Sequence, residues 1–352
     1  MDTATHALLG ALAVQAIPSR GDGTPLTSGK RMIIAAAAAA FPDLDYLGFW
    51  IDPYSFLTQW HRGASHSLVM LPLWAVSLAL LFSAIAGQWA QWQAFVGPCV
   101  IGLLSHVAID LTTVFGTQLL APLHDYRTAL SITFDFDPWI TLIAAIGLAA
   151  ALYRRSLARW GGIVLLCYLA FHAAMQRSAV TVAQRYAAMR QFTDSSLYAL
   201  PQPFSPFHWK LVVAVDDRYA VSHLNLLGDA AMPVLPAAGG LLSMASAYRS
   251  KQNLLWNEPS RFGNSSDTRA LALEVWEQEA FSGFRRFAAL PFLYRIDRGN
   301  DSSCVWFSDL RYLLPTVKVP FRYGMCRFSA GSDWHLYRLR RFTEHDRQWL
   351  SR

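Results

Sequence analysis

Five short motifs in the first 137 residues place histidine and aspartate at the ends of strongly apolar segments. They are Thr5-His6, Pro42–Asp45, His61–Ser67, His106–Asp110 and Asp135–Pro138. An ionised carboxylate is costly to bury beside hydrocarbon unless a partner neutralises it. A divalent metal ion is such a partner, because it neutralises carboxylates and accepts neutral imidazole as a ligand. These motifs therefore predict a metal site built from the ends of apolar segments.

The apolar segments themselves predict a membrane domain. Hydrophobic residues make up 53% of the 352-residue chain and charged residues 15%, which is too apolar for an average soluble protein. A helix that spans a bilayer needs about 20 largely apolar residues. The four strong candidates are Ser67–Gly87, Ala94–Phe115, Trp139–Tyr153 and Trp160–Met175. Two shorter candidates for partial spans are Thr3–Ile17 and Met32–Phe41. We expect a polytopic α-helical domain with about six membrane helices.

The second half of the chain predicts a soluble, strand-rich α+β domain. We expect the membrane domain over residues 1–180, a proline-containing linker over 181–206 and the soluble domain over 207–352. Alternating apolar residues from Trp209 to Val215, followed by an Asp216-Asp217 turn, predict a hairpin. Further elements are expected as a helix over Thr268–Phe287 with Asp267 as its N-cap, and as strands over Cys304–Leu310, Thr316–Arg322 and Trp334–Leu339.

Lysine and arginine are distributed unevenly among the short loops. The loops at 19–31, 87–93 and 154–159 carry six of them (Arg20, Lys30, Arg31, Arg154, Arg155 and Arg159), and the opposite loops carry only Arg62 and Arg127. Cytoplasmic loops are enriched in these residues. With six spans, the amino terminus and residues 178–352 then lie outside the cytoplasm, and the His and Asp motifs all fall toward that outer face. A multi-pass membrane protein whose second half lies in a periplasm-like space is expected.

The cluster has the composition of a hydrolytic metal site. His106 and Asp110 are four residues apart, so a helix presents both on one face. Asp43 and Asp45 flank a helix stop at Pro42, where both carboxylates are expected to turn inward. Mixed His and Asp ligands without Cys are typical of zinc, manganese or iron with an open position for water. Such an ion lowers the pKa of bound water and polarises a phosphoryl or carbonyl oxygen.

The remaining motif residues extend this interpretation. His61 and His66 bracket a glycine-containing loop before a long span, and Arg62 and Arg127 could clamp a phosphate. Taken singly, each motif has a structural alternative, because HxxxD pairs arise by chance and PDLD is a common capped turn. Ser65 lacks the strand–turn–helix elbow of a serine hydrolase. Glycine-rich phosphate loops and nucleic-acid modules are absent from the sequence, so no nucleic-acid partner is expected.

At these residues the sequence resembles the membrane-bound, metal-dependent hydrolase family of bacterial inner membranes that is often called YdjM-like. The motifs T-H, P-D-x-D, H-R-G-x-[ST]-H-S, H-x-x-x-D-L-x-T-x-x-G and L-L-x-P correspond to Thr5-His6, Pro42–Asp45, His61–Ser67, His106–Gly116 and Leu119–Pro122. The match covers about residues 1–180. The family is distantly similar to zinc-dependent phospholipase C and P1 nuclease, whose His and Asp ligands hold a zinc cluster.

This resemblance implies a metal-ligand set of His6, Asp43 or Asp45, His66, His106 and Asp110. The chain departs from the family at Ser65, where Thr is common. It also has no obvious second HxxxE helix of the phospholipase kind, which argues against a full trinuclear site. The cofactor expected is a divalent metal, with zinc first, as one or more ions.

The leading hypothesis is a membrane-embedded hydrolase that cleaves a phosphoester of a lipid or lipid-linked molecule. Its metal ligands would come from His6, Asp43, Asp45, His61, His66, His106 and Asp110. Asp43, His66 and Arg62 are expected to be catalytic, and Arg62 and Arg127 to bind substrate. The rival hypothesis is a non-catalytic binding or assembly protein with a structural ion. If the soluble domain lies outside the cytoplasm, Cys304 and Cys326 are expected to form a disulfide.

Overall fold

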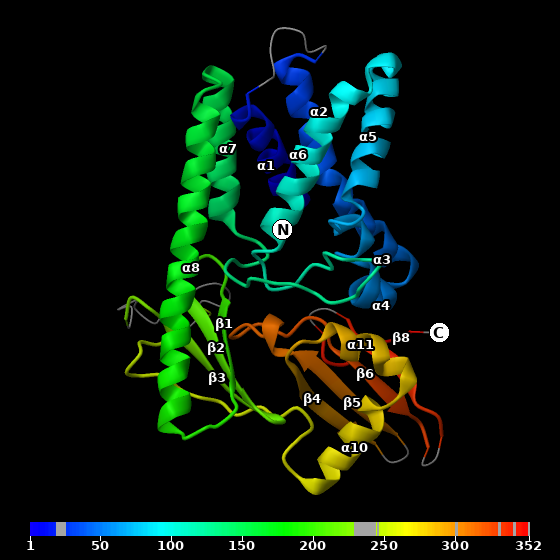
Figure 1. Cartoon of the computed structure of the whole chain (residues 1–352). Coiled ribbons are helices and arrows are strands. Elements are labelled where there is room, and N and C mark those ends of the chain that lie inside the picture. Colours follow the sequence, from blue (N-terminus) through cyan, green and yellow to red (C-terminus); the bar gives the residue numbers. More distant parts are fainter. Residues whose placement is uncertain are drawn as a thin grey trace. The chain divides into compact units, whose positions relative to one another are not determined.

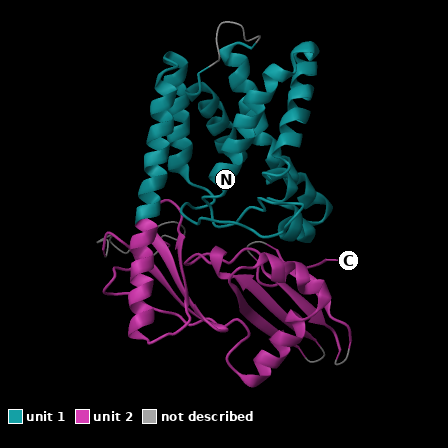
Figure 2. Cartoon of the chain, in the orientation of Figure 1, with its two compact units in different colours: residues 1–174 teal, residues 175–352 magenta. Residues whose placement is uncertain are grey.

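The computed structural model describes residues 1–18, 26–228, 244, 246–299, 302–329, 332–340 and 343–350. Arg20, which entered the topology prediction, lies outside the described residues. The chain divides into two compact units, Met1–Ala174 and Met175–Arg352 (Figure 2). The division falls within one long helix, so each unit contains a part of it.

The first unit is helical (Figure 1). Its α-helices are α1 (Thr3–Ala16), α2 (Ser28–Ala40), α3 (Gly48–Ile51), α4 (Pro53–Ser55), α5 (Leu71–Ile85), α6 (Gln93–Asp110), α7 (Pro138–Tyr153) and the first part of α8 (Leu157–Met189). Short helical turns lie between them: the 3₁₀ turns η1 (Phe41–Leu47), η3 (Ala64–His66) and η4 (Trp89–Gln91), and the π-helical turn η2 (Phe56–Trp60). Side chains of Asp2, Thr27 and Asp137 accept backbone N–H groups at the starts of α1, α2 and α7, which satisfies donors that a helix start leaves open.

Small residues let α1, α2 and α6 pack very closely. A Cβ atom added at Gly10 would lie 2.6 Å from the carbonyl oxygen of Ala35, and one added at Gly102 would collide with the same oxygen. Ala35, Ala38 and Ala39 are fully buried. Glycine and alanine at such contacts allow helix backbones to approach. The alanine run is therefore a helix-packing surface, and it holds the start of α1 beside the ends of α2 and α6.

Among the described residues, three helical segments are long and apolar enough to cross a membrane. They are Ser28–Ile51, Gln93–Asp110 and Leu157–Met189, and a fourth exists if Pro53–His66 and Leu71–Ile85, bent by 72°, form one span. The expected six spans are not supported. Helices α1 and α7 have 14 and 16 residues. At 1.5 Å per residue they are about 21 and 24 Å long, which is short of the roughly 30 Å hydrocarbon core.

The second unit contains a three-stranded antiparallel sheet next to the end of α8. Its strands, in the order β1-β2-β3, are β1 (Ser196–Pro201), β2 (His208–Val215) and β3 (Arg218–Asn225). Strands β2 and β3 form the hairpin predicted at Asp216-Asp217. Residues 181–206 are not a linker, because they contain the last part of α8 and all of β1. Apolar residues of α8, including Ala183 and Ala187, pack with Trp209 and other sheet residues in one core.

A second antiparallel sheet of five strands follows, in the order β4-β5-β6-β7-β8. Its strands are β4 (Pro291–Arg298), β5 (Ser303–Asp309), β6 (Tyr323–Arg327), β7 (His335–Leu339) and β8 (Arg347–Trp349), and its helical elements are α10 (Ser266–Trp276), η5 (Glu279–Phe281), α11 (Ser282–Phe287) and η6 (Leu310–Tyr312). The unit is thus strand-rich and contains helices, as predicted.

Two local predictions in this unit were wrong. The helix expected over residues 268–287 is interrupted at Gln278, whose ψ of 134° is extended, and its N-cap is Ser265 rather than Asp267. The strand expected over residues 316–322 does not form. Thr316 and Phe321 have φ values of 60° and 55°, which an extended strand does not accommodate.

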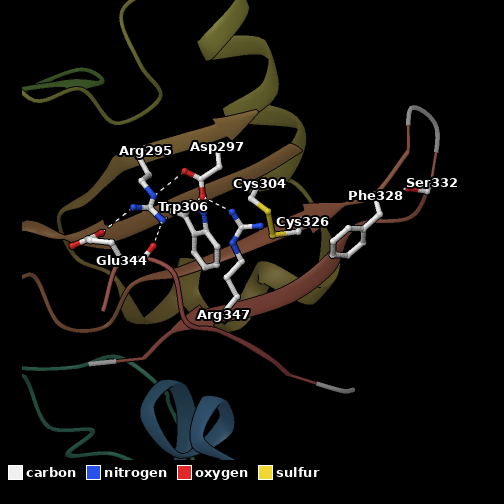
Figure 3. Close-up of a disulfide and its surroundings, with 9 residues drawn as sticks. All are labelled: Arg295, Asp297, Cys304, Trp306, Cys326, Phe328, Ser332, Glu344 and Arg347. Atoms are coloured by element: carbon white, nitrogen blue, oxygen red, sulfur yellow. Dashed lines mark hydrogen bonds and ion pairs between the residues drawn. A yellow bond between two sulfur atoms is a disulfide. The ribbon is translucent and has the colours of Figure 1, made fainter. Parts of the chain in front are cut away.

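Cys304 and Cys326 form a disulfide between β5 and β6 (Figure 3). The two residues are direct partners in the antiparallel register of these strands. Trp306 lies on β5 beside the disulfide, and its indole N–H donates to Asp297 at 2.9 Å. Asp297 also pairs with Arg347 at 2.9 Å. The covalent link therefore lies in a packed, ion-paired part of the sheet.

Candidate metal centre

Five buried side chains from four segments meet at one end of the helical unit. They are His6 in the first turns of α1, Asp43 in η1, His66 at the end of η3, and His106 and Asp110 in the last turns of α6. Asp43 is 6% exposed and the other four are fully buried. Figure 1 shows the start of α1 and the end of α6 at the same end of this unit. We call these five residues the His/Asp cluster.

The spacing of the polar atoms in the His/Asp cluster fits a metal ion. Potential ligand atoms fall into two groups, His6/Asp43/His106 and His66/His106/Asp110, and within each group they lie within 4.8 Å of one another. The Nε2 atoms of His66 and His106 are 3.5 and 3.4 Å from Asp110 Oδ2. Two ligands that are each about 2.1 Å from a tetrahedral zinc ion lie about 3.4 Å apart. The groups share His106, so one ion or two adjacent ions could be held.

Hydrogen bonding within the described part of the chain leaves these atoms unsatisfied. The Nε2 atoms of His6, His66 and His106 are buried without a hydrogen-bond partner. Leaving one buried polar atom unpaired costs about 1–3 kcal/mol. Three such nitrogens beside the carboxylates of Asp43 and Asp110 are therefore expensive unless something binds them. A divalent cation satisfies lone pairs on imidazole nitrogens and carboxylate oxygens together, so the donor set fits a metal.

Contacts on the opposite ring nitrogens orient two of the histidines. His106 Nδ1 lies 2.6 Å from the carbonyl oxygen of Ala39. A carbonyl only accepts, so Nδ1 donates a proton to it, and Nε2 is the ring nitrogen that faces the cluster. His66 Nδ1 lies 2.9 Å from Ser65 Oγ and 3.5 Å from Asp45 Oδ2. Partners of this kind fix the ring orientation of metal-binding histidines.

Asp45 and His61, which were predicted as metal ligands, lie outside both ligand groups. His61 Nδ1 is 3.0 Å from Asp45 Oδ1, so these two side chains pair with each other. Asp45 Oδ2 also accepts the backbone N–H of Arg62 at 3.0 Å and the hydroxyl of Ser65 at 3.2 Å. The carboxylate thus organises the 61–66 loop that carries His66.

The two arginines of the predicted site are bound to protein groups. Arg62 is 4% exposed, its Nε lies 3.0 Å from Asp110 Oδ2, and its Nη1 donates to Thr113 Oγ1 at 2.6 Å. Its φ of 55° is unusual for a residue other than glycine, and such conformations cluster at functional sites. Arg127 Nη1 donates to the carbonyl oxygens of His61 and Gly116 at 3.0 and 3.3 Å. Arg62 therefore borders the His/Asp cluster, whereas Arg127 supports the loop behind it.

Some supporting groups were not singled out from the sequence. Thr3 donates its hydroxyl to Asp43 Oδ2 at 2.6 Å, and the amino group of Met1 pairs with Asp110 Oδ1 at 2.7 Å. No sequence signal marked Thr3. Thr113, the partner of Arg62, is the threonine of the D-L-x-T motif, so that motif could have identified it.

The last acidic motif has a mainly structural role. Asp137 caps α7 and accepts the hydroxyl of Tyr168 at 3.0 Å. Asp135 Oδ1 lies 3.6 Å from Arg62 Nη2, at the border of the cluster. Neither residue belongs to the two ligand groups. The motif therefore supports the cluster's surroundings without supplying a ligand to it.

Comparison with known proteins gives a family. A family profile described as "YdjM inner membrane protein" matches residues 1–179, which contain the whole His/Asp cluster. The chain belongs to this family. It is an inner membrane protein family by its description, which agrees with the apolar helices of the first unit.

One curated relative is "Uncharacterized protein YfhP" of Bacillus subtilis (strain 168). It is 26% identical over 153 residues, which are 42% of this chain and 46% of the relative. The chain thus matches about half the length of that curated relative. No solved structure matched the chain.

Proposed function

We propose that this protein is a membrane-embedded, metal-dependent hydrolase that cleaves a phosphoester of a lipid or lipid-linked molecule at the outer face of the inner membrane. The observation that carries the proposal is the convergence of three unpartnered histidine Nε2 atoms on the carboxylates of Asp43 and Asp110. Clusters of His and Asp at hydrolytic sites hold ions such as zinc with a position open to water.

The proposal assigns metal binding and proton transfer to residues of the His/Asp cluster. The ion, zinc as the first candidate, would be held by His6, Asp43, His66, His106 and Asp110. When bound, it would acidify a water molecule and polarise the phosphoryl oxygen. Thr3 holds Asp43 Oδ2, which leaves Oδ1 directed at His66 and His106, 3.9 and 3.8 Å away. In this proposal, that oxygen would accept a proton from the attacking water.

Arg62 supplies positive charge to the same site. Its guanidinium lies against Asp110 at 3.0 Å and against Thr113, so it is held in a fixed place rather than on a mobile arm. A fixed guanidinium is suited to balance the charge that develops on a phosphoryl group. We propose a catalytic role for Asp43, His66 and Arg62, with Arg127 supporting substrate binding through the loop it braces.

The Cys304–Cys326 disulfide supports an extracytoplasmic second unit. Disulfides persist in oxidising compartments and are rare in the cytosol. A multi-pass arrangement with this unit in the periplasm agrees with that chemistry. The net charge of +6 lies in residues 178–352, which would attract the unit to anionic headgroups.

The test is hydrolysis of bis(p-nitrophenyl) phosphate and of a phospholipid in mixed micelles by detergent-purified protein. We expect turnover that is lost with chelator, restored by zinc and abolished by His106→Ala. His124→Ala is the matched control, because the His124 side chain is 63% exposed and lies outside the His/Asp cluster. Metal-independent turnover, or equal turnover in both variants, would contradict the proposal.

The full burial of four cluster residues favours one alternative, a binding or assembly protein with a structural ion. Structural metal sites are closed, whereas catalytic sites keep an open position. The thermal midpoint of His106→Ala separates the two. A structural ion predicts a large drop in the midpoint, and a catalytic ion predicts lost turnover with the fold retained.

A further inference from the structure

An apolar groove of about 190 Å³ runs beside the His/Asp cluster in the first unit. Helices α1, α6 and α8 form its walls. Ser105 is the one residue with a polar side chain among the described lining residues, and its hydroxyl donates to the carbonyl oxygen of Gly102 in its own helix at 2.7 Å. The groove therefore presents an almost entirely apolar lining to any molecule bound in it.

One end of the groove lies about one helical turn from the His/Asp cluster. Leu9 follows His6 by three residues on α1, and Ile109 follows His106 by three residues on α6. Residues three apart on a helix lie on one face about one turn apart. Leu9 and Ile109 also pack in one core with Leu169 of α8. These residues define the end of the groove that is next to the cluster.

The other end of the groove lies farther into the membrane part. Ala16 lines it on α1 and Gly162 on α8. The seven residues from Leu9 to Ala16 rise about 10 Å. Leu12 lies between them and touches the position where a Cβ of Gly161 would be, at 3.3 Å. The groove thus extends along α1 away from the cluster and into segments that belong to the hydrocarbon region.

We propose that this groove holds a hydrocarbon chain of the substrate while the His/Asp cluster binds its phosphate group. The occupant follows from the surroundings, because α6 and α8 are membrane-spanning candidates and a bilayer presents only acyl or isoprenoid chains at that depth. This inference rests on the proposed function. It implies that residues of α1 and α8 make the protein select long-chain lipid phosphoesters over water-soluble ones.

Gly162 offers a clean way to fill the groove. It lines the groove, and a Cβ added there has no atom within 4 Å, so a larger side chain can start from this position without meeting the backbone of a neighbouring helix. Gly97 on α6 is the matched control, since its added Cβ also meets nothing within 4 Å and it does not line the groove. Gly162→Leu and Gly97→Leu therefore place the same side chain in two open positions of membrane helices.

The first experiment needs no activity. The protein is placed in vesicles of phosphatidylcholine and phosphatidylglycerol that contain phosphatidic acid with a photoactivatable group in the middle of its acyl chain. We expect labelling of the peptides that carry residues 9–16 and 162–169 to fall about threefold in Gly162→Leu and to stay unchanged in Gly97→Leu. A modest factor is expected because a chain that leaves the groove enters equally apolar lipid and loses only packing contacts. Equal labelling of both variants would overturn the proposal.

The second experiment separates the groove from the hydrolase function. KM for the long-chain phosphatidic acid should rise about threefold in Gly162→Leu, while kcat/KM for bis(p-nitrophenyl) phosphate should match the parent protein. If the groove labels as expected but neither substrate is hydrolysed, the groove stands and the hydrolase fails. If the lipid is hydrolysed with unchanged KM by Gly162→Leu, the hydrolase stands and the groove is refuted.

Discussion

Substitution of Asp45 tests whether this residue binds the metal directly or only orients the ligand His66. The structure places its carboxylate against His61, Arg62 and Ser65, and only 3.5 Å from His66 Nδ1, on the side of the ring away from the cluster. Asp45→Asn keeps an accepting oxygen but removes the charge. We expect the variant to fold and to hold His66 less firmly.

The magnitude follows from that indirect role. Changes to the partners of metal-binding histidines lower metal affinity about 10–100-fold. This factor corresponds to about 1.4–2.8 kcal/mol. Asp110→Asn should cause a larger loss, because the fully buried carboxylate of Asp110 itself belongs to a ligand group. The order of the two losses is the prediction.

The assay is competition for zinc between the detergent-purified protein and a chromophoric chelator, with the thermal midpoint measured in parallel. Asp125→Asn serves as the control, since its side chain is 74% exposed, and it should bind zinc like the parent protein. An Asp45→Asn loss as large as that of Asp110→Asn would show that Asp45 is itself a ligand. Unchanged affinity would show that the 61–66 loop does not orient His66.

Three further predictions concern stability. Burial lowers the pKa of Lys210 from 10.5 to about 7. The unfolded chain therefore binds more protons between these values, so the free energy of unfolding should rise from about pH 7 to 10.5, and Lys210→Met should remove that rise in denaturant titrations. The double variant Cys304→Ser/Cys326→Ser removes a disulfide between residues 22 positions apart, so it should lower the free energy of unfolding by about 3 kcal/mol in the same titrations. An unchanged midpoint would contradict this prediction. Gly102→Leu should lower the thermal midpoint far more than Gly97→Leu, because only Gly102 packs against the α2 backbone, and equal midpoints would refute the packing argument.

The sequence predicted which segment ends would meet, because His and Asp at the ends of antiparallel apolar helices gather at one end of a bundle. It did not separate Asp43 from Asp45. These residues lie in a 3₁₀ turn, where each residue rotates by about 120°, so side chains two apart cannot face one point. Hydropathy alone does not show the 3₁₀ turn, and so both were predicted as ligands.

Two other differences have equally local causes. The count of spans was too high because short apolar segments were counted as membrane helices, and α1 and α7 have only 14 and 16 residues. Pro201 was interpreted as part of a stiff linker, yet it ends β1, which is an edge strand of its sheet. Proline is tolerated at an edge because the missing N–H is not needed for pairing there.

The metal content of the protein is the most direct test of the account. Protein purified in mild detergent without chelator is analysed by inductively coupled plasma mass spectrometry beside His106→Ala and His124→Ala. We expect at least one equivalent of a transition metal in the parent protein and in His124→Ala, and a loss of most of it in His106→Ala. Less than about half an equivalent in the parent protein, or equal metal in all three, would contradict a metal centre at the His/Asp cluster.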